Sequence, residues 1–73
     1  MFTEHSLVVL RRDVPESGLL AGDVGSVIGV IDTVRYDVEF TTADGYTVAT
    51  VNLASRDIRS GRAREILHVR EIA

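Results

Sequence analysis

The chain has 73 residues, no cysteine and no lysine, and its 11 acidic residues against eight arginines give a net charge of −3. This length suffices for one domain with a small core, and the lack of cysteine excludes disulfides and thiolate metal sites. A hydrophobic fraction of 45% excludes a disordered chain, and no apolar run is long enough to span a bilayer. We expect residues 1–73 to form a single domain. Because the first residues lack the basic start and apolar core of a signal peptide, we expect a cytoplasmic protein of bacterial type.

The front of the chain is predicted to form two strands joined by a turn. A first strand is expected over residues 5–13, HSLVVLRRD, because they are short, β-branched and bounded by polar residues. Turn residues fill 14–23, VPESGLLAGD, where Pro15 disfavours helical geometry at the residue before it. A second strand, rich in valine and isoleucine, is expected over 23–32, DVGSVIGVID.

A hairpin is predicted in the middle of the chain. Residues 35–41, RYDVEFT, alternate between apolar and acidic side chains, and this period of two indicates a half-buried strand. Its apolar face holds Tyr36, Val38 and Phe40, and its opposite face holds Asp37 and Glu39. An Asp-Gly turn within 43–45 then leads into a returning strand over 46–53, YTVATVNL.

The rear is predicted to hold a short helical turn and a last strand. The turn is expected over 54–61, ASRDIRSG, with Ser55 as its cap and Gly61 at its end. The last strand is expected over 64–72, REILHVREI, and a helix over the same region is the alternative. Five short strands with tight turns and no long helix predict an all-β fold, a small five-stranded antiparallel barrel with one helical turn before its last strand.

Four glycines in the stretch GLLAGDVGSVIGVI (18–31) need an explanation. Their spacing does not fit a dinucleotide-binding loop, a phosphate-binding Walker loop would need a lysine, and the β-branched residues argue against a helix seam. The remaining interpretation is a strand that bends. Gly22 would then take a positive φ before the strand, and Gly25 and Gly29 would mark bulges or a close backbone approach within it.

Three segments together carry a family resemblance: LLAGDVGSVIGV, YDVEFTTADGYTVATVNL and the closing REILHVREIA. They resemble the bacterial family known as domain of unknown function four-nine-two-six. The resemblance implies a compact SH3-like barrel and no established catalytic residues. It also implies a small protein encoded beside a second small gene, as toxin and antitoxin partners are. The segment LAGDVGSV is also similar to the glycine-bearing loop of KOW-type barrels, some of which contact ribosomal RNA or RNA polymerase.

Residues with catalytic or metal-binding chemistry do not gather into a recognisable motif. Only His5 and His68 offer imidazoles, and a metal would need further ligands even if the first and last strands paired. Gly25-Ser26 lacks the second glycine of a nucleophile elbow. We therefore expect no catalytic, cofactor-binding or metal site, no small-molecule substrate, and a protein that is not an enzyme.

Charged residues suggest contacts with a partner instead. We expect Arg56, Arg59, Arg62 and Arg64 to form an anion-facing patch and Asp37 and Glu39 to form an opposite acidic face. Apolar residues near turns and chain ends, some of which must be exposed, suggest a protein partner or self-association. They are Leu19, Leu20, Ile31, Val34, Ile58 and Ile72. The sequence thus predicts a non-catalytic protein-interaction module with an antitoxin-like or regulatory role. The alternative is a KOW-like barrel that binds nucleic acid, as RNA or in the ribosome or polymerase, through the arginine patch.

Overall fold

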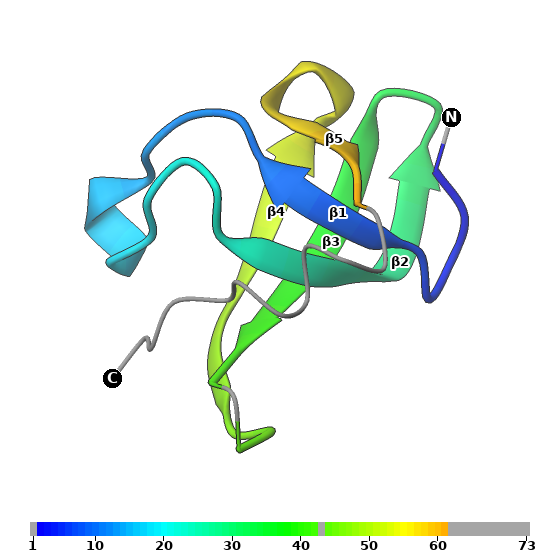
Figure 1. Cartoon of the computed structure of the whole chain (residues 1–73). Helices are drawn as coiled ribbons and strands as arrows, with labels where there is room; N and C mark the ends of the chain where they lie inside the picture. The colour runs from blue at the N-terminus through cyan, green and yellow to red at the C-terminus, as the bar shows by residue number, and fades with distance from the viewer. Residues whose placement is uncertain (1, 43, 62–73) are drawn as a thin grey trace.

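The computed structural model describes residues 2–42 and 44–61, which form five strands and two 3-10 turns. In chain order these are β1 (Leu7–Leu10), η1 (Pro15–Ser17), β2 (Val24–Asp32), β3 (Arg35–Thr41), β4 (Thr47–Ala54), η2 (Ser55–Asp57) and β5 (Ile58–Ser60). All pairings are antiparallel, and the strands form one sheet in the order β4-β3-β2-β1-β5 (Figure 1). The predicted all-β class and a five-stranded antiparallel sheet with a helical turn before its last strand are confirmed for the described residues, although that last strand is Ile58–Ser60 and not the one predicted over 64–72. No helix in the part of the chain that is described is long and apolar enough to cross a membrane.

The sheet is bent but not closed by hydrogen bonds. β4 and β5 stand at the two ends of the strand order, and no ladder joins them within residues 2–42 and 44–61. The chain passes from one to the other through η2. β1 and the first part of β2 run across β3 and β4 (Figure 1), so the two halves of the sheet face each other over a shared core. The hydrogen-bonded closure of a full barrel is therefore not part of the described fold.

The core is built from the inward residues of facing strands. Tyr36, Val38 and Phe40 of β3 are completely buried, as their alternation in the sequence predicts. They pack in one cluster with Val8 and Leu10 of β1, and with further residues from β2, β4, β5 and the η1 loop. The remaining members of that buried cluster are Val14, Leu19, Val27, Leu53 and Ile58.

The rear of the chain differs from its prediction. The helical turn is confined to Ser55–Asp57, and the residues that follow it form β5 rather than more of the turn. Ile58 leaves the turn in extended geometry, with φ −134° and ψ 157°, and pairs with Leu10 while its own side chain is buried. Ser55 does not cap the turn; the carboxylate of Asp57 accepts the amide of Ala54 instead, at 3.2 Å. The strand predicted over 64–72 lies outside the described residues.

The glycine interpretation is confirmed where the structure tests it most directly. Gly22 has φ +96° in the turn that precedes β2. A Cβ atom at Gly25 would lie 2.9 Å from the carbonyl oxygen of Glu39 and 2.9 Å from side-chain atoms of Val38 and Phe40. The ladder between β2 and β3 shifts register between Val27 and Gly29, which is a bulge. Residues 22–31 therefore form a turn and a bent strand rather than a helix or a ligand loop.

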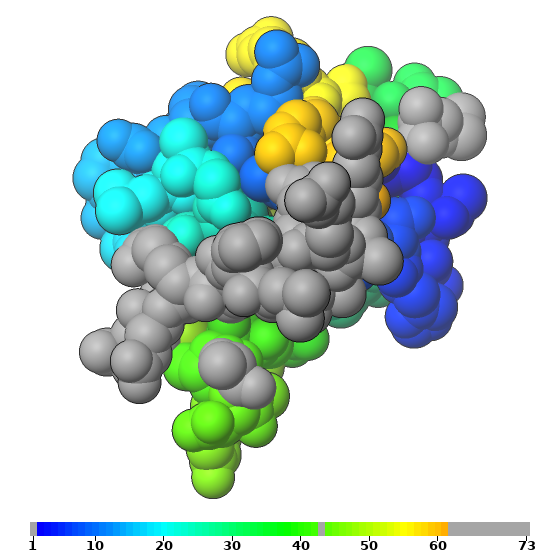
Figure 2. Space-filling view, in the orientation of Figure 1, coloured from blue at the N-terminus to red at the C-terminus, as the bar shows by residue number. Residues whose placement is uncertain are grey.

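Two other boundaries follow from local geometry. The first strand is shorter than predicted, because His5 has φ 69° and regular pairing begins at Leu7. The hairpin between β3 and β4 forms at the predicted Asp-Gly turn, where Gly45 has φ +92° and Thr42 and Tyr46 are joined through a 2.8 Å backbone hydrogen bond. This hairpin projects from the body of the domain (Figure 2).

Candidate functional site

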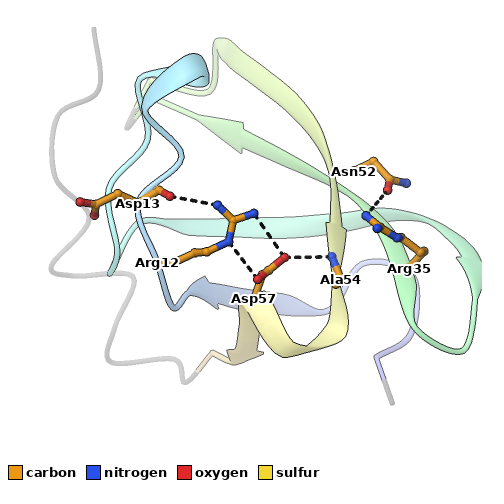
Figure 3. A network of polar contacts seen from close by, with 6 residues as sticks. All are labelled: Arg12, Asp13, Arg35, Asn52, Ala54 and Asp57. Carbon is orange, nitrogen blue, oxygen red and sulfur yellow. Dashed lines mark hydrogen bonds and ion pairs between the residues drawn. The ribbon is translucent and has the colours of Figure 1, made fainter.

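The two acidic residues predicted as a contact surface lie on the outward face of β3. Asp37 and Glu39 are both half-buried and alternate with the core residues of the strand. Each accepts a hydrogen bond from β4: Asp37 Oδ1 from Asn52 Nδ2 at 3.1 Å, and Glu39 Oε2 from Thr47 Oγ1 at 2.9 Å. Arg35 donates to Asn52 Oδ1 at 3.1 Å, as drawn in Figure 3. These carboxylates therefore hold β4 against β3 in addition to any contact they make with a partner.

The predicted arginine patch is only partly within the described residues. Arg56 lies in η2 and Arg59 in β5, and both are exposed. The guanidinium of Arg59 donates to the carbonyl oxygen of Ser60 at 3.3 Å. Arg62 and Arg64 lie outside the described residues. The structure thus places two of the four predicted arginines at the corner formed by η2 and β5.

Two further arginines reach this corner from the other end of the chain. β5 pairs with β1, so the end of β1 brings Arg11 and Arg12 beside η2. The backbone amide of Arg11 donates to the carbonyl oxygen of Asp57 at 2.8 Å. Sequence reasoning missed both residues because it considered pairing of the first and last strands only for the histidines. The signal that could have found them is the Arg-Arg pair near the end of the first predicted strand, 5–13.

Arg12 is already paired within the domain. Its Nε donates to Asp57 Oδ1 at 2.9 Å and its Nη1 to the carbonyl oxygen of Asp13 at 3.1 Å (Figure 3). The hydrogen bond from Arg12 lowers the pKa of the Asp57 carboxyl, and the bond from the Ala54 amide acts in the same direction. The same ion pair raises the pKa of Arg12. Arg12 therefore joins β1 to η2, and Arg11, Arg56 and Arg59 are exposed at the same corner.

Large apolar side chains are exposed at several places outside this corner. Three of them gather at the end of β2 and in the turn that follows: Val30, Ile31 and Val34, with exposed fractions of 45%, 57% and 55%. Others lie on the β3–β4 hairpin and β4, where Tyr46 is 74% exposed, and in the turn before β2, where Leu20 is 49% exposed. Ile28 and Val48 complete the set. The sequence predicted that some of six apolar residues near turns and chain ends are exposed. Two of these six, Leu19 and Ile58, are core residues, and Ile72 is outside the described range.

Residues 4–60 of the chain match the family described as Domain of unknown function (DUF4926). The chain belongs to this family. The match ends at the last residue of β5, so the closing segment REILHVREIA lies outside it. No protein of curated function and no solved structure matches the chain.

The DUF4926 domain holds its polar groups in structural roles wherever they are buried. In the described part of the chain, every buried side-chain nitrogen or oxygen atom has a hydrogen-bond partner. Asp23, the buried charged residue, accepts the amide of Leu20 at 2.9 Å in the turn before β2. The same part of the chain contains no group of three or more histidine and carboxylate residues that could hold a metal ion. His5 is exposed there, and His68 lies outside it.

Proposed function

We propose that this DUF4926 domain is an SH3-like barrel that acts as a non-catalytic module and binds another protein chain. Three features support the barrel: the strand order, the bulged β2 that pairs with both β1 and β3, and the 3-10 turn between β4 and β5. The antitoxin-like or regulatory role expected from the sequence would follow if that partner is a neighbouring small protein.

The observation that carries this proposal is the apolar cluster at the β2–β3 turn. Val30, Ile31 and Val34 are about half exposed, whereas the inward residues of the same strands are completely buried. The backbone of Val34 is held in place, because its amide donates to Asp32 Oδ1 at 2.8 Å and its carbonyl accepts the amide of Ser55 at 2.9 Å. Exposed apolar side chains concentrated around one turn of a small domain are typical of a protein-binding surface.

Affinity capture with matched variants tests this proposal. The double variant Ile31→Asp/Val34→Asp places two carboxylates in the cluster, and Thr33→Asp adds a carboxylate at an exposed polar residue of the same turn. We expect a partner protein from the native cell to be retained by the wild type and by Thr33→Asp, and lost by the double variant. Equal retention by all three proteins would contradict the proposal.

Nucleic-acid binding is a second candidate, which the arginine corner favours. Pairing of β1 with β5 places Arg11 beside Arg56 and Arg59, three exposed cations from distant parts of the sequence. Phosphate contacts supply most of the non-specific affinity for nucleic acid, and each one adds about one unit to the salt slope. The triple alanine variant should therefore flatten the salt dependence of RNA binding by about three units if the corner binds phosphate. An unchanged slope would discard this candidate.

A further inference from the structure

The outer edge of β4 has no paired strand in residues 2–42 and 44–61. β4 is eight residues long, TVATVNLA, and contains no charged residue and no proline. The other edge of the sheet, β5, has only three residues and carries Arg59. Proteins normally protect long edge strands with charges, proline or bulges, because an open edge pairs with other chains. β4 carries a bulge between Thr47 and Ala49, but its regular edge from residue 49 onward lacks all three devices, whereas β5 is short and carries a charge. The β4 edge from residue 49 onward is therefore open to an added strand.

The register with β3 identifies the backbone groups that face this edge. The amide of Ser55 donates to Val34, and in an antiparallel ladder the direction of these groups alternates along the strand. The groups of Val51 and Leu53 thus point toward β3, and those of Thr50 and Asn52 point away from it. The amide of Ala54 follows this alternation, since it points away from β3 and donates a hydrogen bond to the carboxylate of Asp57. The backbone amides and carbonyls of Thr50 and Asn52 are therefore the groups that a partner strand would bond.

The usable part of the edge is symmetric about one residue. Its ladder with β3 is regular from Ala49 onward, because a register shift falls between the Thr41–Thr47 and Phe40–Ala49 pairs. It ends before Ala54, whose amide is already bonded. The stretch 49–53 that remains has Val51 at its centre. An antiparallel copy of the same stretch, related by a two-fold axis at Val51, would place Thr50 opposite Asn52 and keep the inward and outward faces of both strands aligned.

We infer that the β4 edge pairs with the β4 edge of a second copy of this chain, forming a two-fold symmetric dimer centred on Val51. This inference goes beyond the proposed function, because it concerns a different surface and specifies a second copy of this chain as the partner of the β4 edge. The dimer gains four backbone hydrogen bonds, two from each Thr50–Asn52 pair across the axis. On the inner face Val51 meets its symmetry mate, and Ala49 meets Leu53, so the partly buried apolar row next to the core continues across the junction.

Charged side chains beside the edge do not oppose this arrangement. The charged residues of β3 are already hydrogen-bonded to β4 within each copy: Arg35 and Asp37 contact Asn52, and Glu39 accepts a hydrogen bond from Thr47. Thr50 and Asn52, which would meet across the axis, are both uncharged. A chain of different sequence would need to supply the matching face pattern.

Sedimentation equilibrium of the full chain tests the inference with two matched lysine variants. Thr50→Lys places a charge on the proposed junction, and Ser60→Lys places the same charge on the β5 edge, at a residue that is also exposed. We expect wild type and Ser60→Lys to dimerise alike. We expect Thr50→Lys to weaken dimerisation by about tenfold to a hundredfold, because a lysine side chain on an edge strand opposes pairing with another chain, and the dimer carries two copies of it at the junction.

Cysteine cross-linking tests the register in a chain that has no cysteine of its own. The two-fold axis places the two Val51 Cα atoms about 4.5 Å apart, near the range that a disulfide spans. Thr50 faces Asn52 of the other copy, so Thr50→Cys, although more exposed, should cross-link at least about ten times more slowly than Val51→Cys.

Three outcomes would overturn the inference: a wild type that stays monomeric at millimolar concentration, equal dimerisation of the two lysine variants, or faster cross-linking of Thr50→Cys than of Val51→Cys. A monomeric wild type that still captures a partner through Ile31 and Val34 would remove the dimer and leave the proposed function standing. A dimer that captures nothing would leave this inference standing and remove the proposed function.

Discussion

Replacing Gly25 by alanine should strongly destabilise the domain. The added methyl carbon would lie 2.9 Å from the carbonyl oxygen of Glu39 and 2.9 Å from carbon atoms of Val38 and Phe40. All three belong to β3, the strand that pairs with Gly25, and two belong to fully buried side chains. The clash can be relieved only by moving β3 away from β2. Overpacking of this kind costs about 1–3 kcal/mol, and the backbone contact places Gly25→Ala near the upper limit.

The matched control is Gly29→Ala in the same strand. A methyl carbon there would lie 3.6 Å from Asp37, which is ordinary van der Waals contact. This variant should change the free energy of unfolding by less than about 1 kcal/mol, and a small gain is expected because alanine restricts the unfolded chain. Urea unfolding followed by circular dichroism measures both values. Gly25→Ala should lower the melting temperature by about 10–20 °C, since 1 kcal/mol corresponds to about 4–8 °C in a domain of this size. Equal stability of the two variants would refute the close-approach explanation.

Three further predictions concern the core and the ion pair between Arg12 and Asp57. Leu19→Ala should cost about 2–5 kcal/mol of unfolding free energy because this side chain is fully buried, whereas Leu20→Ala, half exposed, should cost less than about 1 kcal/mol in the same denaturation experiment. Tyr36→Phe should lower the free energy of unfolding by about 1 kcal/mol, because the Tyr36 hydroxyl donates to the carbonyl oxygen of Thr33 and accepts the amide of Phe2, both at 3.3 Å. A change below about 0.5 kcal/mol, on the order of thermal energy, would show that these two hydrogen bonds contribute little. The pKa of Asp57 is lowered in the folded state. Its contribution to the free energy of unfolding is therefore fully present above the pKa of the unfolded chain, about 3.9, and is lost as the pH falls from there through the pKa of the folded state. Asp57→Ala should therefore be less stable at pH 7 and lose less stability than the wild type between pH 5 and about 2; parallel pH profiles would contradict this.

The sequence was most informative where one physical rule decided the structure. The alternation in RYDVEFT predicted which β3 residues are buried, because a half-buried strand must place successive side chains on opposite faces. The glycine spacing predicted a bent strand, since only glycine fits the approach of β2 to β3 at residue 25. The Asp-Gly pair likewise predicted the β3–β4 hairpin.

The sequence was less informative where distant segments meet. β5 was missed because Ile58–Ser60 is too short to show a strand pattern, and its identity depends on pairing with β1. For the same reason the neighbours of Arg56 and Arg59 included Arg11 and Arg12, which lie more than forty residues earlier in the sequence. Asp57 illustrates a further difficulty: near the arginines it suggests charge pairing, but the sequence does not show that Arg12 is its partner.

The edge position of β4 could not be predicted from the sequence, because strand order is a property of the whole sheet. YTVATVNL predicts a strand, but nothing in these residues indicates whether the strand lies in the middle of a sheet or at its edge. The observed strand order places β4 at one end of the sheet. Because β4 is an edge strand, its lack of charged residues indicates that another strand can pair with it.

Amide hydrogen exchange at β4, measured by NMR at low and high protein concentration, tests most directly whether this edge is a binding surface. The account predicts that the amides of Thr50 and Asn52 exchange rapidly in dilute solution and become protected as concentration rises. The amides of Val51 and Leu53, which face β3, should be protected at both concentrations and serve as the internal reference. Exchange at Thr50 and Asn52 that does not depend on concentration would contradict the account.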